Sequence, residues 1–161
     1  MKCRIMAALA ALAIFAPLAA RADSQPHMDM QHGAQVMPFN QSQATHMFLP
    51  DPSGGVLEIV VHDMDAQQIA LVRSHLLGEA AKFIKGNYSD PAFIHGQDMP
   101  GLSALESGAA RVSVRYFETP TGAAITLSSS DSTMVVAIHQ WLAAQSHDHG
   151  SADMRHCDMK M

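Results

Sequence analysis

The side chains with the most distinctive chemistry gather near the two ends of this chain of 161 residues. Both ends are rich in Met and His, and the second also holds a Cys. Thioether, thiolate and imidazole groups together form the soft ligand set that selects Cu(I) over hard cations. We therefore predict metal binding at both ends, with copper, as Cu(I), the leading metal. The ligands assigned to these ends are His27, Met28, Met30, His32, His147, His149, Met154, His156, Cys157, Met159 and Met161.

A second candidate site lies in the interior of the chain. His95 stands four residues before Met99 in a segment punctuated by Pro and Gly. If that segment begins as a helical turn, the two side chains share one face and form a His/Met site. In the alternative interpretation the segment is a structural loop, in which His95 donates to a backbone carbonyl.

His139 is the third piece of this interior site. It belongs to the apolar face of the last predicted helix, where a histidine is more often a hydrogen-bonded core residue than a ligand. It becomes a ligand if His46, His95 or His149 folds against it. Asp98 and Asp148 would then orient imidazoles by accepting their second N–H.

The first residues have the form of a secretory signal. Lys2 and Arg4 precede an apolar run over 5–20, and Ala20-Arg21-Ala22 resembles a cleavage site. The run is too short to span a bilayer comfortably. We expect residues 1–22 to be removed and the protein to be periplasmic or secreted.

Removal of that signal would make the chain strongly acidic. Seven basic residues would remain against fifteen acidic ones, a net charge of −8. Such a charge disfavours nucleic acid and anionic membrane surfaces as partners. Cys157 would be the one cysteine left, so no disulfide can form within the mature chain. The expected partners are a metal ion and another periplasmic copper protein that exchanges it.

The elements that must position these side chains lie in the middle of the chain. We expect an extended arm over 23–53, a folded domain over 54–146 and a flexible tail over 147–161. The elements expected in the domain are a strand over 56–61, a helix over 65–85, a hairpin over 112–127 that turns at 119–122, and a helix capped by Asp131 or Ser132. The fold class is α+β, a small sheet of about three strands covered by two main helices.

The apolar faces of the two helices follow from spacing. They consist of Ile69, Val72, Leu76, Ala80 and Phe83 in the first helix, and of Val135, Ile138 and Leu142 in the last. His75 is expected on the wet flank of the first helix. Trp141 falls outside the centre of the last helix's stripe, and we assign it no role.

Three segments of this chain resemble a known family. They are Thr45–Phe48, His95–Gly101 and Ala137–Trp141 followed by 145–150, and they are similar to segments of small secreted proteobacterial proteins of undefined activity. The resemblance covers about residues 44–150 and implies that His46, His95, His139 and His149 belong to the family pattern. Some members are labelled aspartate carbamoyltransferase. This chain does not support that label, since it is about half the necessary length and has no Ser-Thr-Arg-Thr loop for carbamoyl phosphate.

Motifs of common catalytic sites are absent from the sequence. It contains no glycine-rich phosphate loop and no G-x-S-x-G, H-E-x-x-H or C-x-x-C pattern. We therefore predict a periplasmic copper-binding protein without enzymatic activity, acting as a chaperone, buffer or tolerance factor. One alternative is a domain that binds haem or a small molecule through His95 or His139. A small metal-dependent hydrolase or lyase ranks last.

Overall fold

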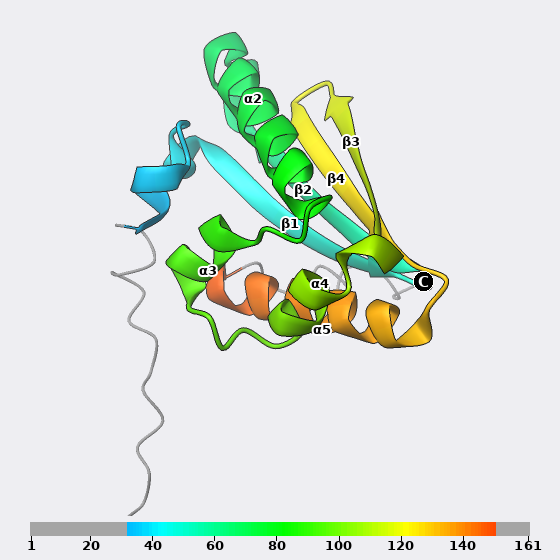
Figure 1. The fold of residues 1–161 in the computed structure, drawn as a ribbon. Helices are drawn as coiled ribbons and strands as arrows, with labels where there is room; N and C mark the ends of the chain where they lie inside the picture. The colour runs from blue at the N-terminus through cyan, green and yellow to red at the C-terminus, as the bar shows by residue number, and fades with distance from the viewer. Residues whose placement is uncertain (1–31, 151–161) are drawn as a thin grey trace, which may run out of the picture.

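A computed structural model describes residues 32–150 as an α+β fold around one antiparallel sheet (Figure 1). The sheet has four strands in the order β1-β2-β4-β3, so two hairpins meet at its centre. The strands are β1 (Ala44–Asp51), β2 (Gly54–Val61), β3 (Ser113–Thr119) and β4 (Gly122–Ser128). The α-helices are α2 (Ala66–Phe83), α3 (Ser89–His95), α4 (Leu102–Ser107) and α5 (Ser132–Asp148), with short 3-10 turns η1 (Gln41–Gln43), η2 (His62–Met64) and η3 (Ala109–Arg111). The α+β class is as predicted.

The strand β1 corrects the predicted domain boundary. Residues 44–51 were assigned to the extended arm, whereas they pair along their full length with β2. Pro50 and Pro52 led to that assignment, but a proline is compatible with an edge strand because its missing N–H faces no partner. The turn between the strands is closed by Asp51, whose Oδ1 accepts from the backbone N–H of Ser53 at 2.7 Å. The sheet therefore has one strand more than predicted.

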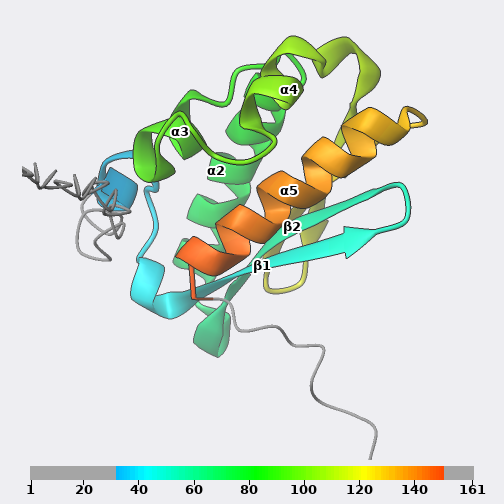
Figure 2. The ribbon, with the colours of Figure 1, turned by 90° about the horizontal axis from the view of Figure 1, so that it is seen from below.

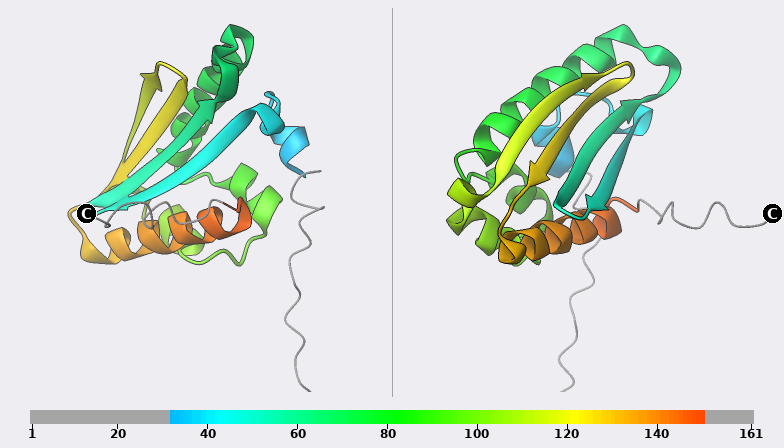
Figure 3. Two further views of the ribbon diagram at one scale, coloured as in Figure 1. Left: turned by 180° about the vertical axis from the view of Figure 1, so that it is seen from behind. Right: turned by 90° about the vertical axis from the view of Figure 1, so that its right-hand side faces the viewer.

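The helices α2 and α5 lie on one face of the sheet. Contacts join α2 mainly to β3 and β4, and α5 to β1 and β2 (Figures 1 and 2). Figure 3 shows the opposite face of the sheet without a covering helix. The short helices α3 and α4 lie on the same side of the sheet as α2 and α5, and α4 packs against α5. Among residues 32–150, no helix is both long and apolar enough to cross a membrane.

Local signals set the N-terminal ends of the two long helices as expected. Asp65 caps α2, because its Oδ1 accepts from the backbone N–H groups of Gln67 at 2.9 Å and Gln68 at 3.1 Å. Of the two residues considered as caps for α5, Asp131 performs this role and accepts from Thr133 N at 2.8 Å. All five apolar positions predicted for the first helix are buried.

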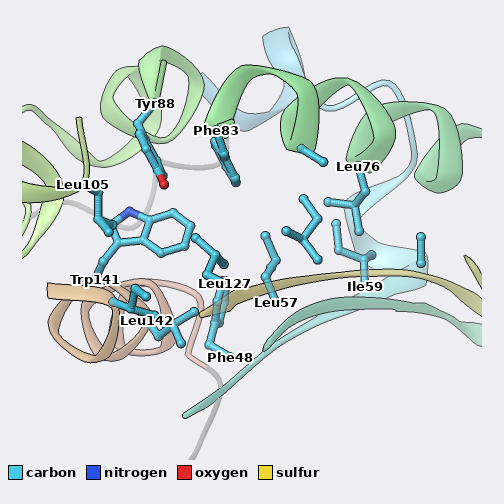
Figure 4. Close-up of a cluster of buried hydrophobic side chains, with 14 of the residues drawn as sticks. Phe48, Leu57, Ile59, Leu76, Phe83, Tyr88, Leu105, Leu127, Trp141 and Leu142 are labelled. Carbon is cyan, nitrogen blue, oxygen red and sulfur yellow. The ribbon is translucent and has the colours of Figure 1, made fainter. Parts of the chain in front are cut away.

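Trp141 corrects the predicted apolar face of α5. Its side chain is 1% exposed, and its ring lies 5.7 Å from that of Phe83 and 5.6 Å from that of Tyr88, both edge-on (Figure 4). The buried stripe of α5 runs through Met134, Ala137, Ile138, Trp141, Leu142 and Gln145. Val135 lies at its margin, so the stripe is rotated from the predicted one towards Trp141.

Candidate functional site

A pocket opens between the sheet and the helices beside β1. Its cavity volume is about 50 Å³. By the same measure, a cavity needs roughly 10–15 Å³ to hold one water molecule. This is room for an ion with a few waters or for a very small molecule. Four histidines line it, together with apolar side chains from the core: His46, His75, His95 and His149.

Three of these imidazoles form a contiguous group, which we call the histidine cluster: His46, His95 and His149. The rings of His46 and His149 are stacked, with centroids 4.5 Å apart and planes inclined by 19°. The ring of His95 meets that of His149 edge-on at 5.0 Å. The three side chains come from segments separated by about fifty residues each, so the tertiary fold alone brings them together.

Each member of the histidine cluster is placed by a simple local feature. His46 pairs with Ile59 across β1 and β2, so it lies on the buried face of the sheet. His95 is the last residue of α3, where Gly96 ends the helix with a positive φ of 93°. His149 is the C-cap of α5. Two of the three imidazoles therefore lie at helix ends that point into the same space.

A carboxylate supports the cluster from outside. Asp148 Oδ2 lies 3.1 Å from His95 Nδ1, and the His95 side chain is only 2% exposed. A carboxylate this close acts on the imidazole through its charge. The contact does not have the geometry of a hydrogen bond to Nδ1, so the predicted role of Asp148 as an acceptor for an imidazole stays a prediction.

Burial keeps two imidazoles of the cluster uncharged. Burial, together with the smaller effects of His149, His75 and His95, lowers the pKa of His46 to about 3. Burial also lowers the pKa of His149 to about 4, with a further contribution from His95 and an opposing one from Asp148. Both rings are therefore neutral at pH 7, which is the protonation state that a metal ligand needs.

Acidic groups also line the pocket. Glu79 and Asp90, which we call the acidic pair, both bind Lys82, whose Nζ lies 2.7 Å from Glu79 Oε1 and 2.6 Å from Asp90 Oδ2. Burial raises the pKa of Glu79, and the hydrogen bond with Asp90 adds to the effect of burial. Burial also acts to raise the pKa of Asp90, but hydrogen bonds from Lys82 and Glu79 outweigh it and lower that pKa. As the pH falls, the pair therefore takes up a proton on Glu79 before Asp90.

His75 is the fourth histidine of the pocket, and its position corrects a prediction. It was expected on the wet flank of α2, whereas it lines the pocket and its ring lies 5.6 Å from that of Phe39. Burial lowers its pKa to about 4, and the nearby Lys82 acts in the same direction. One signal in the sequence pointed here: His75 and Glu79 are spaced i, i+4 beside the apolar stripe of α2, so both lean towards the core.

The other predicted ligands within the described residues lie elsewhere. His139 Nε2 donates to the carbonyl oxygen of Asp51 at 2.8 Å, which ties α5 to the β1–β2 turn. The Met99 side chain is buried, and its Sδ lies 3.9 Å from Gln145 Nε2 rather than beside the histidine cluster. The ring of His32 lies against Phe93 at 4.6 Å.

His147 and the chain ends complete the predicted set. The His147 side chain is 89% exposed and approaches Asp148 at 3.3 Å. The remaining predicted ligands lie outside the described residues: His27, Met28, Met30, Met154, His156, Cys157, Met159 and Met161.

The histidine cluster contains the donor atoms of a metal site, but its rings are not arranged to bind one ion. Within residues 32–150, no group of three or more His, Cys, Asp and Glu side chains is arranged to hold a metal ion. The reason is visible in the stacking of His46 on His149, because near-parallel rings do not direct their nitrogens at one point. A metal would require these rings to turn.

Comparison with known proteins adds no relative. The chain matches no protein-family model, no curated protein and no solved structure. The similarity to small secreted proteobacterial proteins thus remains a prediction, and the function is argued from the site.

Proposed function

We propose that this protein binds copper in the periplasm or outside the cell, and that the histidine cluster is the metal site of its folded domain. The observation that carries the proposal is the convergence of His46, His95 and His149 on one pocket. Imidazole nitrogen is a good ligand for copper, and a buried position excludes competing water. His46 and His149 need lose no proton before binding, because burial already keeps them neutral.

The spacing of the rings supports this proposal. Two imidazoles bound to one tetrahedral ion at about 2 Å place their ring centroids roughly 5 Å apart. The two contacts within the cluster measure 4.5 Å and 5.0 Å. The rings are therefore at the right separation but in the wrong orientation. Binding requires the rings of His46 and His149 to turn so that their nitrogens point at one ion.

The Met/His/Cys-rich ends fit the role of a copper carrier or buffer. His149 is five residues before Met154 in the sequence, so the C-terminal ligands follow the cluster directly along the chain. Exchange of Cu(I) between sulfur and imidazole donors would make binding tight but transferable. We propose that the ends capture the ion and that the cluster holds it.

The pocket favours this proposal over a haem site. Haem on His95 or His139 was the main alternative, but His139 bonds to Asp51 away from the pocket. The cavity beside His95 is far too small for a macrocycle. Haem could enter only by displacing the residues near the N-terminus that line the pocket. For the metal-dependent enzyme, the acidic pair supplies carboxylates that line the pocket and could act as a general base, and Glu79→Gln would abolish any such turnover.

The test is an anaerobic competition titration of the full chain against a chromogenic Cu(I) chelator. We expect H149Q to lose one bound equivalent, or to bind the last equivalent at least tenfold more weakly. The matched control is H62Q, since His62 is exposed and bonds only Thr45 in the described structure. Thermal unfolding of both variants shows that each is folded. Identical titrations of H149Q, H62Q and the unchanged chain would refute the proposal.

A further inference from the structure

The segment of residues 32–40, which we call the strap, covers one side of the pocket. It begins with a helical turn and leads into η1 and β1. Met37 and Phe39 from the strap are 6% and 5% exposed, so the strap packs against the core. The ring of Phe39 lies 5.8 Å from that of His46, which places the strap directly beside the histidine cluster.

Two contacts hold the strap in place. Asn40 N donates to Gln68 Oε1 at 2.7 Å, which fixes the end of the strap to α2. Met37 N donates to Gly33 O at 2.8 Å and closes the helical turn. A Cβ at Gly33 would lie only 2.6 Å from the methyl carbon of Met37, so the glycine leaves the space into which the Met37 side chain folds.

Met37 differs from the other buried methionines of the described structure. It lines the pocket together with all three members of the histidine cluster. Met99 instead contacts Gln145, and Met134 lies against Gly108, so neither lines this pocket. Met37 was not among the ligands assigned from the sequence, because nothing local distinguishes it from a core methionine.

From this placement we propose that Met37 is the sulfur ligand of the copper site and closes the strap over the ion. The inference rests on the proposed function and adds a fourth donor to the three imidazoles. A thioether is a soft and uncharged ligand, which stabilises Cu(I) but contributes little to Zn²⁺. It also cannot be protonated in the accessible pH range. Met37 would thus give selectivity for the reduced ion and couple the position of the strap to metal binding.

The experiment compares M37L with M99L in the full chain. Leucine keeps the volume and the apolar character of methionine and removes the sulfur, so both variants are expected to fold. Affinities for Cu(I) and for Zn²⁺ are measured by chelator competition. We expect M37L to bind the last Cu(I) equivalent at least tenfold more weakly, with Zn²⁺ affinity changed less than twofold, and M99L to resemble the unchanged chain for both ions.

A second readout separates ligation from packing. With ¹³C-methyl-labelled methionine, the Met37 signal is identified by its absence in M37L, and we expect it to shift on addition of Cu(I) but not of Zn²⁺. Equal Cu(I) affinity of M37L and M99L, a parallel loss of Zn²⁺ affinity, or an unmoved Met37 signal while Cu(I) binds would overturn this inference and leave the proposed function standing. A full chain that does not bind Cu(I) overturns both.

Discussion

Mild acid should destabilise this protein far more than an average domain. The perturbation is a change from pH 7 to pH 5 in the absence of metal. His46, His75 and His149 have pKa values of about 3, 4 and 4 in the folded chain, against 6.5 for a free side chain. Each therefore takes up its proton more readily in the unfolded chain. Stability from this source is complete above about pH 7 and is lost as the pH falls below 6.5.

The magnitude follows from the difference in proton uptake. At pH 5, each of the three groups is almost fully protonated in the unfolded chain and almost fully neutral in the folded one. Each then lowers the free energy of unfolding by about 2 kcal/mol. Part of the lowered pKa of His46 comes from repulsion by His149, and this repulsion acts only when both rings are protonated. The three losses therefore do not add fully. We expect a total of about 3 to 6 kcal/mol, a large part of the roughly 5–15 kcal/mol that stabilises a typical domain.

The assay is urea unfolding followed by the fluorescence of Trp141, the one tryptophan of the chain, at several pH values with a metal chelator present. H75F retains a ring in contact with Phe39 and should lose about 2 kcal/mol of the pH dependence. Glu79 acts in the opposite sense, because its raised pKa makes the folded chain take up a proton first as the pH falls. The E79Q background removes that contribution. A loss of less than about 1 kcal/mol between pH 7 and pH 5 in that background would refute the reasoning.

Three further predictions concern the core, the acidic pair and two glycines. W141A should lower the free energy of unfolding by about 3–5 kcal/mol in urea titrations, since it empties the centre of the core. D90N should lower it by about 1–3 kcal/mol at pH 7, because it removes the charge that accepts from Lys82. E79Q should lower it less than D90N does, because burial raises the pKa of Glu79 and so disfavours the charge that Gln removes. G78A should raise the melting temperature, with a gain of about 0.5–1 kcal/mol, since nothing lies within 4 Å of the added methyl group. G101A should lower the free energy of unfolding by about 1–3 kcal/mol, since Gly101 has a φ of 81° and a Cβ there would lie 2.2 Å from a carbonyl oxygen of α5.

The elements that the sequence predicts well are those with a strong local pattern. The capping of α2 by Asp65 and its five buried apolar positions depend on neighbours within the helix, so spacing alone reveals them. The strand β1 was missed because Pro50 and Pro52 indicate an extended chain, and only its pairing with β2 makes it part of the sheet. Trp141 was misplaced because α5 has an apolar face broader than the three residues first chosen.

The members of the histidine cluster were each named as candidate ligands but were not predicted to form one group, since the interior site was assigned to His95, Met99 and His139. His46, His95 and His149 were all named, yet their meeting depends on where β1, α3 and α5 end in space, which no local pattern determines. His139 was placed with them because it lies on an apolar helix face, but its partner is a backbone carbonyl 88 residues away. Met37 was missed because only the path of the strap brings it to the pocket.

The measurement that tests the central claim most directly is imidazole ¹⁵N NMR of the full chain during anaerobic addition of Cu(I). Copper binding at the histidine cluster predicts that the ring nitrogen signals of His46, His95 and His149 shift together and in proportion to one bound equivalent. The signals of His62 and His139 should stay in place, because both rings bond elsewhere. Copper that binds the chain while the signals of the cluster remain unmoved would contradict the account.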